Sequence, residues 1–219
     1  MRVILTGATG MVGQGVLREC LLDPGVAEVL SIARSSVHQQ NPKLRELIVP
    51  DIANLAGNEP QFTGYDACFF CAGVSSVGIS EEKYTHLTYD LTLSFARTIA
   101  PLNPQMTFIY VSGASTDSTE KGRSMWARVK GRTENALLRL PFKAAYMFRP
   151  GFIQPLHGIR SKTPLYQFIY DITAPLTRLL LNKLPKYLTT TEQIGRAMLA
   201  VVRNGYSKTI LDPEDINRL

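Results

Sequence analysis

An apolar run, Arg2–Leu5, is followed by three glycines spaced three residues apart in Thr6–Gly13, which reads Thr-Gly-Ala-Thr-Gly-Met-Val-Gly. Gly7 would let the chain turn tightly, Gly10 would let the backbone approach a pyrophosphate, and Gly13 would let a helix pack against the preceding strand. The N–H groups at the start of that helix would then point at phosphate oxygens. The pattern predicts a dinucleotide site, although an ordinary glycine-rich turn between strand and helix has the same composition. The predicted contacts from this segment are Thr6, Gly7, Thr9, Gly10, Met11 and Val12.

The residues that end the next two apolar runs bear on which dinucleotide would bind. An acidic side chain about twenty residues beyond such glycines accepts hydrogen bonds from the adenosine ribose and disfavours a 2′-phosphate. Here the second run ends in Ala33-Arg34-Ser35-Ser36, so a guanidinium and two hydroxyls stand where the added phosphate would lie. We therefore predict NADP(H) in preference to NAD(H), unless Arg34 is only a solvated residue at a strand end. Asp51 and Ile52 follow the third run and are predicted to contact the adenine, although Asp51 would equally well cap a turn.

Apolar runs alternate with helical patterns along most of the chain. Further strand-like runs are expected at Val26–Ala33, Leu44–Val49, Ala67–Cys71, Met106–Ser112 and Ala144–Phe148. Helical patterns fill Gly13–Leu22, Ser80–Ile99, Met125–Leu140 and Glu192–Arg203, and Pro101 and Pro141 would stop two of these helices. Strands that alternate with helices in this way predict an α/β fold with a Rossmann-type, doubly wound parallel sheet.

The pattern changes after Arg149-Pro150-Gly151. Residues 152–162 lose periodicity, and an aromatic and leucine-rich helix-like run follows from Pro164 to Leu181, with Pro175 inside it. From its length we expect the whole chain, 1–219, to form one domain, with 152–190 as a small C-terminal cap on the substrate side of the sheet. The apolar face of this run would also suit a dimer surface, whereas it lacks the basic face that membrane contact requires.

With these residues in place, the chain resembles the short-chain dehydrogenase/reductase superfamily, in particular its atypical extended branch, which includes nucleotide-sugar epimerases. The resemblance covers nearly the whole chain and depends on three motifs in order. They are Thr6–Gly13 for Thr-Gly-x-x-Gly-x-x-Gly, Cys71-Ala72-Gly73 for the Ala-Gly loop after the fourth strand, and Arg149-Pro150-Gly151 for Arg-Pro-Gly after the sixth. The resemblance implies that Cys71, Ala72, Gly73 and Pro150 lie beside the cofactor.

The family's reaction uses a serine and a Tyr-x-x-x-Lys pair, in which tyrosine exchanges a proton with the substrate while hydride moves to or from the nicotinamide. Tyrosine, with an ordinary pKa of about 10, is a poor base until a neighbouring cation stabilises its phenolate. In this chain the matching lysine is Lys130, but Trp126 stands four residues earlier, and an indole has no useful acid–base chemistry. The resemblance therefore implies that Lys130 binds the cofactor ribose while the proton-transfer residue is missing.

Two serines after the fifth strand-like run complete the predicted catalytic set with Lys130. Ser112 and Ser115 flank Gly113-Ala114, and either hydroxyl would orient a substrate carbonyl, although a serine at a strand end is as often bound to local backbone. His157 follows the Arg-Pro-Gly turn and is the best substitute for the phenol on its chemistry alone. The other titratable candidates are expected to pack or to lie at the surface: Tyr84, His86, Tyr89 and Asp90.

Composition bounds the class of protein and its partners. The chain has 219 residues, of which 45% are hydrophobic and 19% charged, so it can bury a full core without disulfides or metals. Its net charge of +6 favours anionic partners, but Lys and Arg are scattered rather than clustered, which argues against nucleic acid. No apolar run has the length of a membrane span, and no spacing of His, Cys, Asp or Glu indicates a metal site. We expect a small-molecule substrate and consider a homodimer an open alternative to a monomer.

The cysteines and the early first strand bear on location. A secretory signal is not expected, because its removal would take the phosphate-binding turn with it, and the three cysteines suit a reducing cytoplasm. We therefore predict a cytoplasmic protein. Cys68 and Cys71 have the spacing of a redox pair, but in a strand they would point to opposite faces, so we expect them in the core.

These expectations favour an NADP(H)-binding protein, similar to short-chain dehydrogenases, that reduces or epimerises a small carbonyl or sugar-like substrate. The alternative is a regulatory protein that senses NADPH without transferring protons, and Trp126 is the residue that favours it. A third hypothesis, an interaction module with an empty site, requires that no dinucleotide binds.

Overall fold

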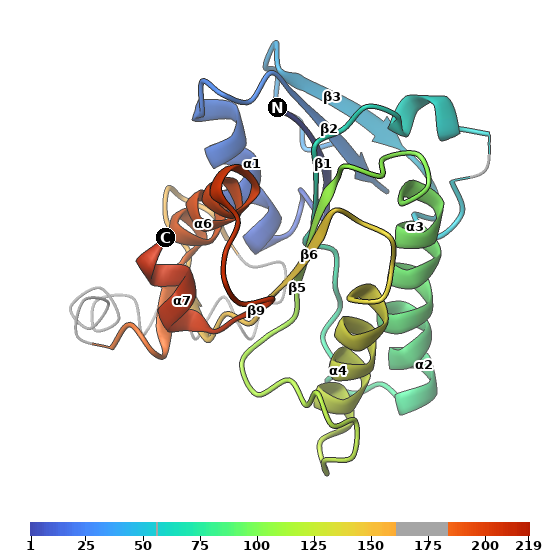
Figure 1. The fold of residues 1–219 in the computed structure, drawn as a ribbon, viewed down its shortest axis with the longest axis vertical. Coiled ribbons are helices and arrows are strands. Elements are labelled where there is room, and N and C mark those ends of the chain that lie inside the picture. Colours follow the sequence, from blue (N-terminus) through green and yellow to red (C-terminus); the bar gives the residue numbers. More distant parts are fainter. Residues whose placement is uncertain (56, 161–183) are drawn as a thin grey trace.

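A parallel sheet of seven strands forms the centre of the described chain, residues 1–55, 57–160 and 184–219 of a computed structural model (Figure 1). The strands run in the order β3-β2-β1-β4-β5-β6-β9, and each neighbouring pair is parallel. Their bounds are β1 Arg2–Thr6, β2 Glu28–Ala33, β3 Leu44–Ile48, β4 Ala67–Phe70, β5 Thr107–Val111, β6 Ala144–Phe148 and β9 Ile210–Leu211. The strand order reverses between β1 and β4, and open α/β sheets bind their ligands outside the carboxyl ends of the strands at such a point. The predicted Rossmann-type fold is confirmed.

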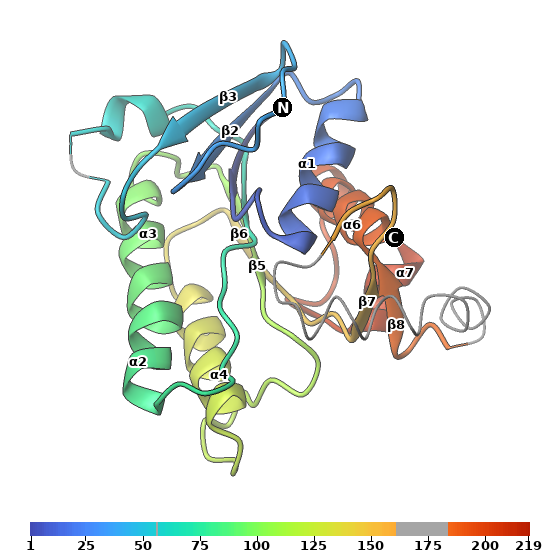
Figure 2. The same cartoon turned by 180° about the vertical axis from the view of Figure 1, so that it is seen from behind.

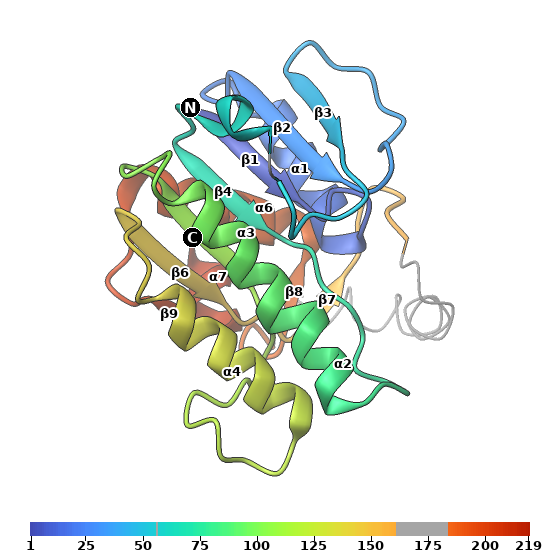
Figure 3. The same ribbon diagram turned by 90° about the vertical axis from the view of Figure 1, so that its right-hand side faces the viewer.

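Helices cover both faces of the sheet. On one face lie α1 (Met11–Leu22), α6 (Thr191–Asn204) and α7 (Pro213–Arg218), as Figure 1 shows. The other face is covered by α2 (Glu81–Thr85), the π-helical turn η2 (His86–Asp90), α3 (Leu91–Ile99) and α4 (Met125–Leu137), which cross in front of the sheet in Figure 3. A short 3₁₀ helix, η1 (Glu59–Phe62), precedes β4.

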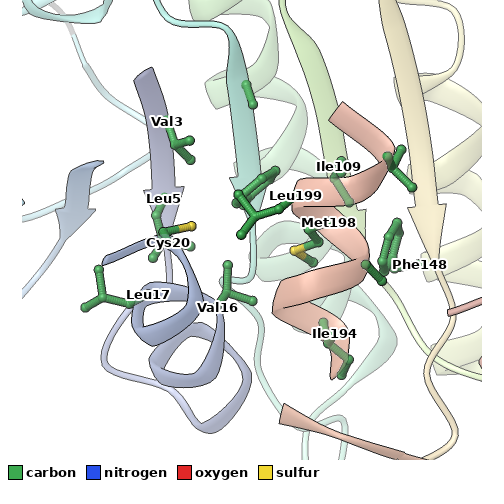
Figure 4. Close-up of a cluster of buried hydrophobic side chains, with 14 of the residues drawn as sticks. Val3, Leu5, Val16, Leu17, Cys20, Ile109, Phe148, Ile194, Met198 and Leu199 are labelled. Atoms are coloured by element: carbon green, nitrogen blue, oxygen red, sulfur yellow. The ribbon is translucent and has the colours of Figure 1, made fainter. Parts of the chain in front are cut away.

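Alternation along the buried strands builds one core on each side of the sheet. Val3 and Leu5 of β1 point towards α1 and α6, where they meet Val16 and Met198 (Figure 4), whereas Ile4 between them packs on the α3 side. The two cysteines near the end of β4 follow the same rule: Cys68 belongs to the α3-side cluster and Cys71 packs against the α1-side cluster, both as free thiols. The expected opposite faces are confirmed, and Cys68 lies in the core, whereas Cys71 is only partly buried and lines a cavity.

The structure refines several predicted elements. The helix expected over Ser80–Ile99 forms, but it contains the π turn η2, because five residues there bond one position further back than in an α-helix. A small parallel pair, β7 (Phe152–Gln154) and β8 (Leu188–Thr190), was not predicted; Figure 2 shows the two strands side by side. Most of the predicted cap, including the run from Pro164 to Leu181, lies in 161–183, outside the described residues.

Candidate functional site

The turn between β1 and α1 has the conformation that its glycines permit. Gly7 has a φ of +73°, which side chains rarely allow, and its carbonyl accepts a hydrogen bond from the Gly10 N–H at 2.8 Å. A Cβ on Gly13 would lie 2.0 Å from the same carbonyl oxygen, so only glycine lets α1 start this close to the turn. Gly10 is the N-cap residue and offers no side chain to the first N–H groups of α1. These N–H groups therefore suit an anion.

A cavity of about 480 Å³ lies beside this turn, at the carboxyl ends of β1, β2 and β4. Ten of the residues predicted to bind the cofactor line it: Gly7, Thr9, Gly10, Arg34, Ser35, Asp51, Ile52, Cys71, Ala72 and Gly73. Thr6 is buried, and its hydroxyl oxygen accepts a hydrogen bond from the Ala72 N–H at 3.4 Å, which joins the loop after β4 to the end of β1. The other predicted residues, Met11, Val12, Lys130 and Pro150, do not line this cavity.

Eight lining residues were not predicted, and three of them come from the helix after β4. His86, Leu87 and Leu91 face the cavity from η2 and the start of α3. The apolar spacing of Leu87 and Leu91 indicates one helix face, but nothing in the sequence says that a π turn brings His86 into line with them. The rest extend the predicted segments by a residue or two: Ile32, Ala33, Pro50, Ala53 and Val74.

Arg34 and Ser35 supply the polar groups at the end of β2. Arg34 is exposed, and its guanidinium has no hydrogen bond or ion pair within the described part of the chain. Ser36 is differently placed, because its hydroxyl donates to Glu46 Oε2 at 2.7 Å, and the other oxygen of Glu46 accepts from the Val37 N–H at 2.8 Å. The structure thus leaves Arg34 and Ser35 beside the cavity and ties Ser36 to β3.

The sequence left Asp51 either as a contact of the adenine or as the cap of a turn, and its position is compatible with both. Its Oδ1 accepts a hydrogen bond from the Ala53 N–H at 2.9 Å, so the carboxylate caps the turn after β3. The same residue lines the cavity beside Ile52, and its second oxygen accepts no hydrogen bond from the residues that the structure describes. A second cavity, of about 540 Å³, shares Thr9 and Ser35 with the first and continues along α1 past Gln14.

Ser112, immediately after β5, belongs to a buried polar network rather than to a free site. Its hydroxyl donates to Glu134 Oε1 at 2.5 Å, and Glu134 of α4 is fully buried. The carboxylate of Glu134 is held by two nitrogens of Arg149, whose guanidinium also donates to the Ser118 hydroxyl at 2.5 Å. This network joins the end of β6, the loop after β5 and the middle of α4, and it occupies the hydroxyl that was predicted to orient a substrate.

Lys130 reaches the same edge of the sheet from α4. Its ammonium donates to the Ser112 carbonyl at 2.5 Å, which leaves two further N–H donors for other partners. Burial lowers the pKa of Lys130 to about 8, and the carboxylate of Glu134, one helical turn away, partly opposes this shift. The group is therefore still cationic at neutral pH but titrates in the range where enzymes use acid–base groups.

The loop after β5 is packed closely against α4. A Cβ on Gly131 would lie 1.8 Å from the Asp117 carbonyl oxygen, and the Asp117 N–H donates to the Ala127 carbonyl at 3.1 Å. Ser115, within this loop, is exposed and has a φ of +66°. Trp126 is half-buried in the first turn of α4, on the face that it shares with Lys130. The roles predicted for Ser112, Ser115 and Lys130 stay predictions.

Three of the groups considered as substitutes for the missing phenol, His157, Tyr84 and Tyr89, lie outside the cofactor cavity. His157 contacts Glu192 of α6, with its Nε2 2.5 Å from a carboxylate oxygen, and lines neither cavity described above. Tyr84 is buried, and the Tyr89 ring lies under the Arg132 guanidinium at 4.2 Å. These positions fit the packing and surface roles expected for the tyrosines.

A family model matches this arrangement. Residues 3–123, from β1 through the loop after β5, fit the model of the NAD dependent epimerase/dehydratase family. The chain belongs to this family. The match includes the glycine turn and all the residues that line the 480 Å³ cavity, and it stops just before α4. The resemblance to extended short-chain dehydrogenases is thereby confirmed.

Curated relatives of this family member are fungal proteins. It is 28% identical over 179 residues to "Leucinostatins biosynthesis cluster protein T" of Purpureocillium lilacinum, an alignment that covers 80% of this chain and 64% of that protein. It is also 28% identical over 158 residues to "Protein fmp52, mitochondrial" of Emericella nidulans, covering 69% and 66%. The chain thus spans just under two thirds of the length of these relatives.

Solved structures show the same fold at low sequence identity. Gre2 of Candida albicans, in complex with NADPH, has a TM-score of 0.71 at 15% identity, over 97% of this chain and 78% of that one. DesIV of Streptomyces venezuelae, a dTDP-glucose 4,6-dehydratase with NAD and TYD bound, has a TM-score of 0.69 at 17% identity, over 96% and 74%.

The predicted cytoplasmic location is wrong by comparison with these relatives. The fmp52 proteins of Emericella nidulans, Aspergillus terreus and Aspergillus fumigatus all carry the word mitochondrial in their names. Cysteine content could not separate the two locations, because three free thiols are compatible with either. Among the described helices, none combines the length and the apolar character that crossing a bilayer requires.

Proposed function

We propose that this family member binds NADP(H) in preference to NAD(H) and transfers hydride between it and a small carbonyl or sugar-like compound. The observation that carries the cofactor preference is the end of β2, where Arg34 and Ser35 line the cavity. A guanidinium without a protein partner among the described residues suits the 2′-phosphate, because a planar fork of donors binds phosphate oxygens in pairs.

The remainder of the cavity fits the adenosine and pyrophosphate. Ile32, Ile52, Leu87 and Leu91 provide apolar walls for a flat base, and the free oxygen of Asp51 would accept from its amino group. The turn from Gly7 to Gly13 presents the first N–H groups of α1 to the pyrophosphate. Proteins with this fold were solved with NADPH or with NAD, which supports a nicotinamide cofactor here and leaves the choice between the two to Arg34 and Ser35.

Replacing Arg34 by alanine tests the preference. We expect NADPH to bind about ten- to a hundredfold more weakly, because a charge-assisted hydrogen bond contributes about 1.5–3 kcal/mol, while NADH affinity stays the same. Titration followed by fluorescence and thermal shift measures both constants. Arg139→Ala is the matched control, since it removes one charge from an exposed position outside both cavities. Equal loss of NADPH and NADH affinity would contradict a role for Arg34 at the phosphate.

A second candidate function is NADPH sensing without turnover. Trp126 stands where the family has its proton-transfer tyrosine, and the Ser112 hydroxyl is held by Glu134. A sensor would bind NADPH and leave its absorbance unchanged with every acceptor offered. Whether the protein is a monomer or a homodimer also stays open, and the mass of the purified protein in solution tests it.

A further inference from the structure

The residues beside the predicted nicotinamide position indicate which class of acceptor can be reduced without a proton from the protein. This inference rests on the proposed NADP(H) binding and concerns the substrate class of the same site. Reduction of an ordinary ketone forms an alkoxide, a very strong base, and therefore needs a proton donor in the transition state. The side chain at the family's donor position is Trp126, whose indole N–H does not dissociate in any useful range.

Trp126 lies at the carboxyl edge of the sheet. Lys130, one turn later on the same face of α4, donates to the Ser112 carbonyl directly after β5, so this face of α4 is turned towards that edge. The indole is half-buried. It can therefore offer part of a flat, polarisable ring to a bound molecule, and aromatic rings pack favourably in offset or edge arrangements.

The loop after β4 adds exposed apolar side chains to the same edge. Val74 is 39% exposed and lines the cofactor cavity, and Val77 is 72% exposed. α2 starts at Glu81, four residues after Val77, and it is held to the first turn of α4 because Arg128 donates to Glu81 Oε2 at 2.6 Å. This loop leads into α2, and α2 is tied to the turn of α4 that carries Trp126. Its exposed valines favour an apolar partner over a hydroxyl-rich sugar.

Lys130 places a positive charge at this edge, and its ammonium has donors to spare. The ammonium of Lys130 uses one N–H for the Ser112 carbonyl and keeps two. Glu134 does not neutralise it by direct contact, because that carboxylate is held by Arg149 and by the Ser112 hydroxyl. A cation at this position would stabilise negative charge that develops on an acceptor oxygen.

The geometry points to a conjugated, apolar carbonyl acceptor of the quinone class, which stacks on Trp126, takes hydride without a proton from the protein, and places its developing anion against Lys130. A quinone, unlike a ketone, can be reduced without a proton donor, because its reduction product is a delocalised phenolate rather than an alkoxide. A phenolate is a much weaker base than an alkoxide, because a phenol has a pKa of about 10.

The electrons and protons of this step balance without a further reagent. The C4–H bond of the dihydronicotinamide breaks and its electron pair leaves with the hydrogen, which oxidises NADPH to NADP⁺. The hydride forms a new O–H bond to one carbonyl oxygen of the quinone, the ring gains two electrons and becomes aromatic, and the product is the hydroquinone monoanion with its negative charge on the other oxygen. Water supplies the second proton after the anion leaves the Lys130 ammonium.

The test compares two acceptors with the full-length protein. Menadione is the quinone probe and cyclohexanone the ketone control, each with NADPH, and absorbance of the reduced cofactor is followed against an enzyme-free blank. We expect turnover of menadione, none of cyclohexanone, a primary isotope effect with C4-deuterated NADPH, and no solvent isotope effect. Turnover of cyclohexanone, or a solvent isotope effect on menadione reduction, shows a protein proton donor and overturns the inference.

Variants separate the stacking and charge contributions. Trp126→Phe should keep activity within about threefold, whereas Trp126→Ala should raise the KM for menadione about tenfold. Lys130→Met should lower kcat about a hundredfold and Lys130→Arg should restore most of it, while Lys143→Met, at an exposed position, serves as control. Equal activity in Lys130→Met and the native protein overturns the role of the cation.

Binding is read independently of activity, because Trp126 is the only tryptophan in the chain. Its fluorescence should fall when NADPH binds, through energy transfer to the dihydronicotinamide, and again when menadione is added. NADPH binding without menadione reduction overturns this inference and leaves the cofactor proposal standing. Absence of NADPH binding overturns both.

The pH profile gives a further check with a defined direction. Because burial lowers the pKa of Lys130 to about 8, the cation is present below that pH and is lost as the pH rises through it. We expect kcat for menadione to be level from pH 6 to about 7 and to decline above about 8, and the decline to move to higher pH in Lys130→Arg. A kcat that rises through the same range contradicts an electrostatic role for the ammonium.

Discussion

We expect Glu134→Gln to lower the free energy of unfolding by about 3 kcal/mol, because removal of one partner from a buried ion pair leaves the other charge uncompensated. Glu134 is completely buried, and the side chain of Arg149 is only 13% exposed. The change would also loosen the Ser112 hydroxyl, which donates to the same carboxylate. Urea unfolding at pH 7 measures the loss, with Glu82→Gln on the exposed surface of α2 as the matched control.

A second variant separates the ion pair from the packing. Replacement of both partners, Glu134→Leu with Arg149→Met, removes both buried charges together, and such exchanges are often close to neutral. We therefore expect the double variant to be more stable than Glu134→Gln. A loss below about 0.5 kcal/mol in Glu134→Gln would mean that water reaches the carboxylate and that the network is not the tie between α4 and β6.

Gly13→Ala should abolish measurable NADPH binding and destabilise the protein by about 1–3 kcal/mol, as overpacking of a tight contact usually does. The added methyl carbon would lie 2.0 Å from the Gly7 carbonyl oxygen, and a backbone atom cannot swing aside as a side chain would. α1 must therefore move away from the turn, and its first N–H groups move with it. NADPH titration and thermal unfolding measure the two effects.

Two other glycines make this prediction specific. A Cβ on Gly113 would meet nothing within 4 Å, so Gly113→Ala should change stability by less than about 0.5 kcal/mol. Gly10→Ala tests the phosphate site without disrupting the fold. The added Cβ would lie 3.3 Å from the Gly7 carbonyl oxygen, and the φ of −86° at this position suits alanine. We expect this variant to fold and to bind NADPH more weakly. Unchanged NADPH affinity in both Gly13→Ala and Gly10→Ala would place the pyrophosphate elsewhere.

The cofactor half of the site could be predicted because its residues depend on local chain geometry. Gly10 and Gly13 both approach the Gly7 carbonyl, within seven residues of chain. Parallel strands place Arg34, Asp51 and Gly73 at one edge of the sheet whatever the loops do. The alternation of strands and helices fixed the fold class in the same way. These features follow from short-range sterics and from strand direction.

The catalytic half could not be predicted to the same depth, because it depends on contacts between residues far apart in the chain. Ser112 and Glu134 are 22 positions apart, and Glu134 and Arg149 are 15 apart. No local pattern therefore shows that the Glu134 carboxylate accepts hydrogen bonds from both a serine and an arginine. The π turn in the helix after β4, whose first residue His86 lines the cavity, likewise corresponds to no local pattern of residue types.

The sequence by itself determined the Rossmann-type fold, the phosphate-binding turn, the basic end of β2 and the absence of tyrosine at position 126, because each is a matter of residue type or local spacing. Only the tertiary structure decided that the Ser112 hydroxyl is committed to Glu134 and that burial brings the pKa of Lys130 to about 8. Burial and charge pairing depend on which distant segments meet, and a pKa depends on the groups and the solvent around it in space rather than along the chain.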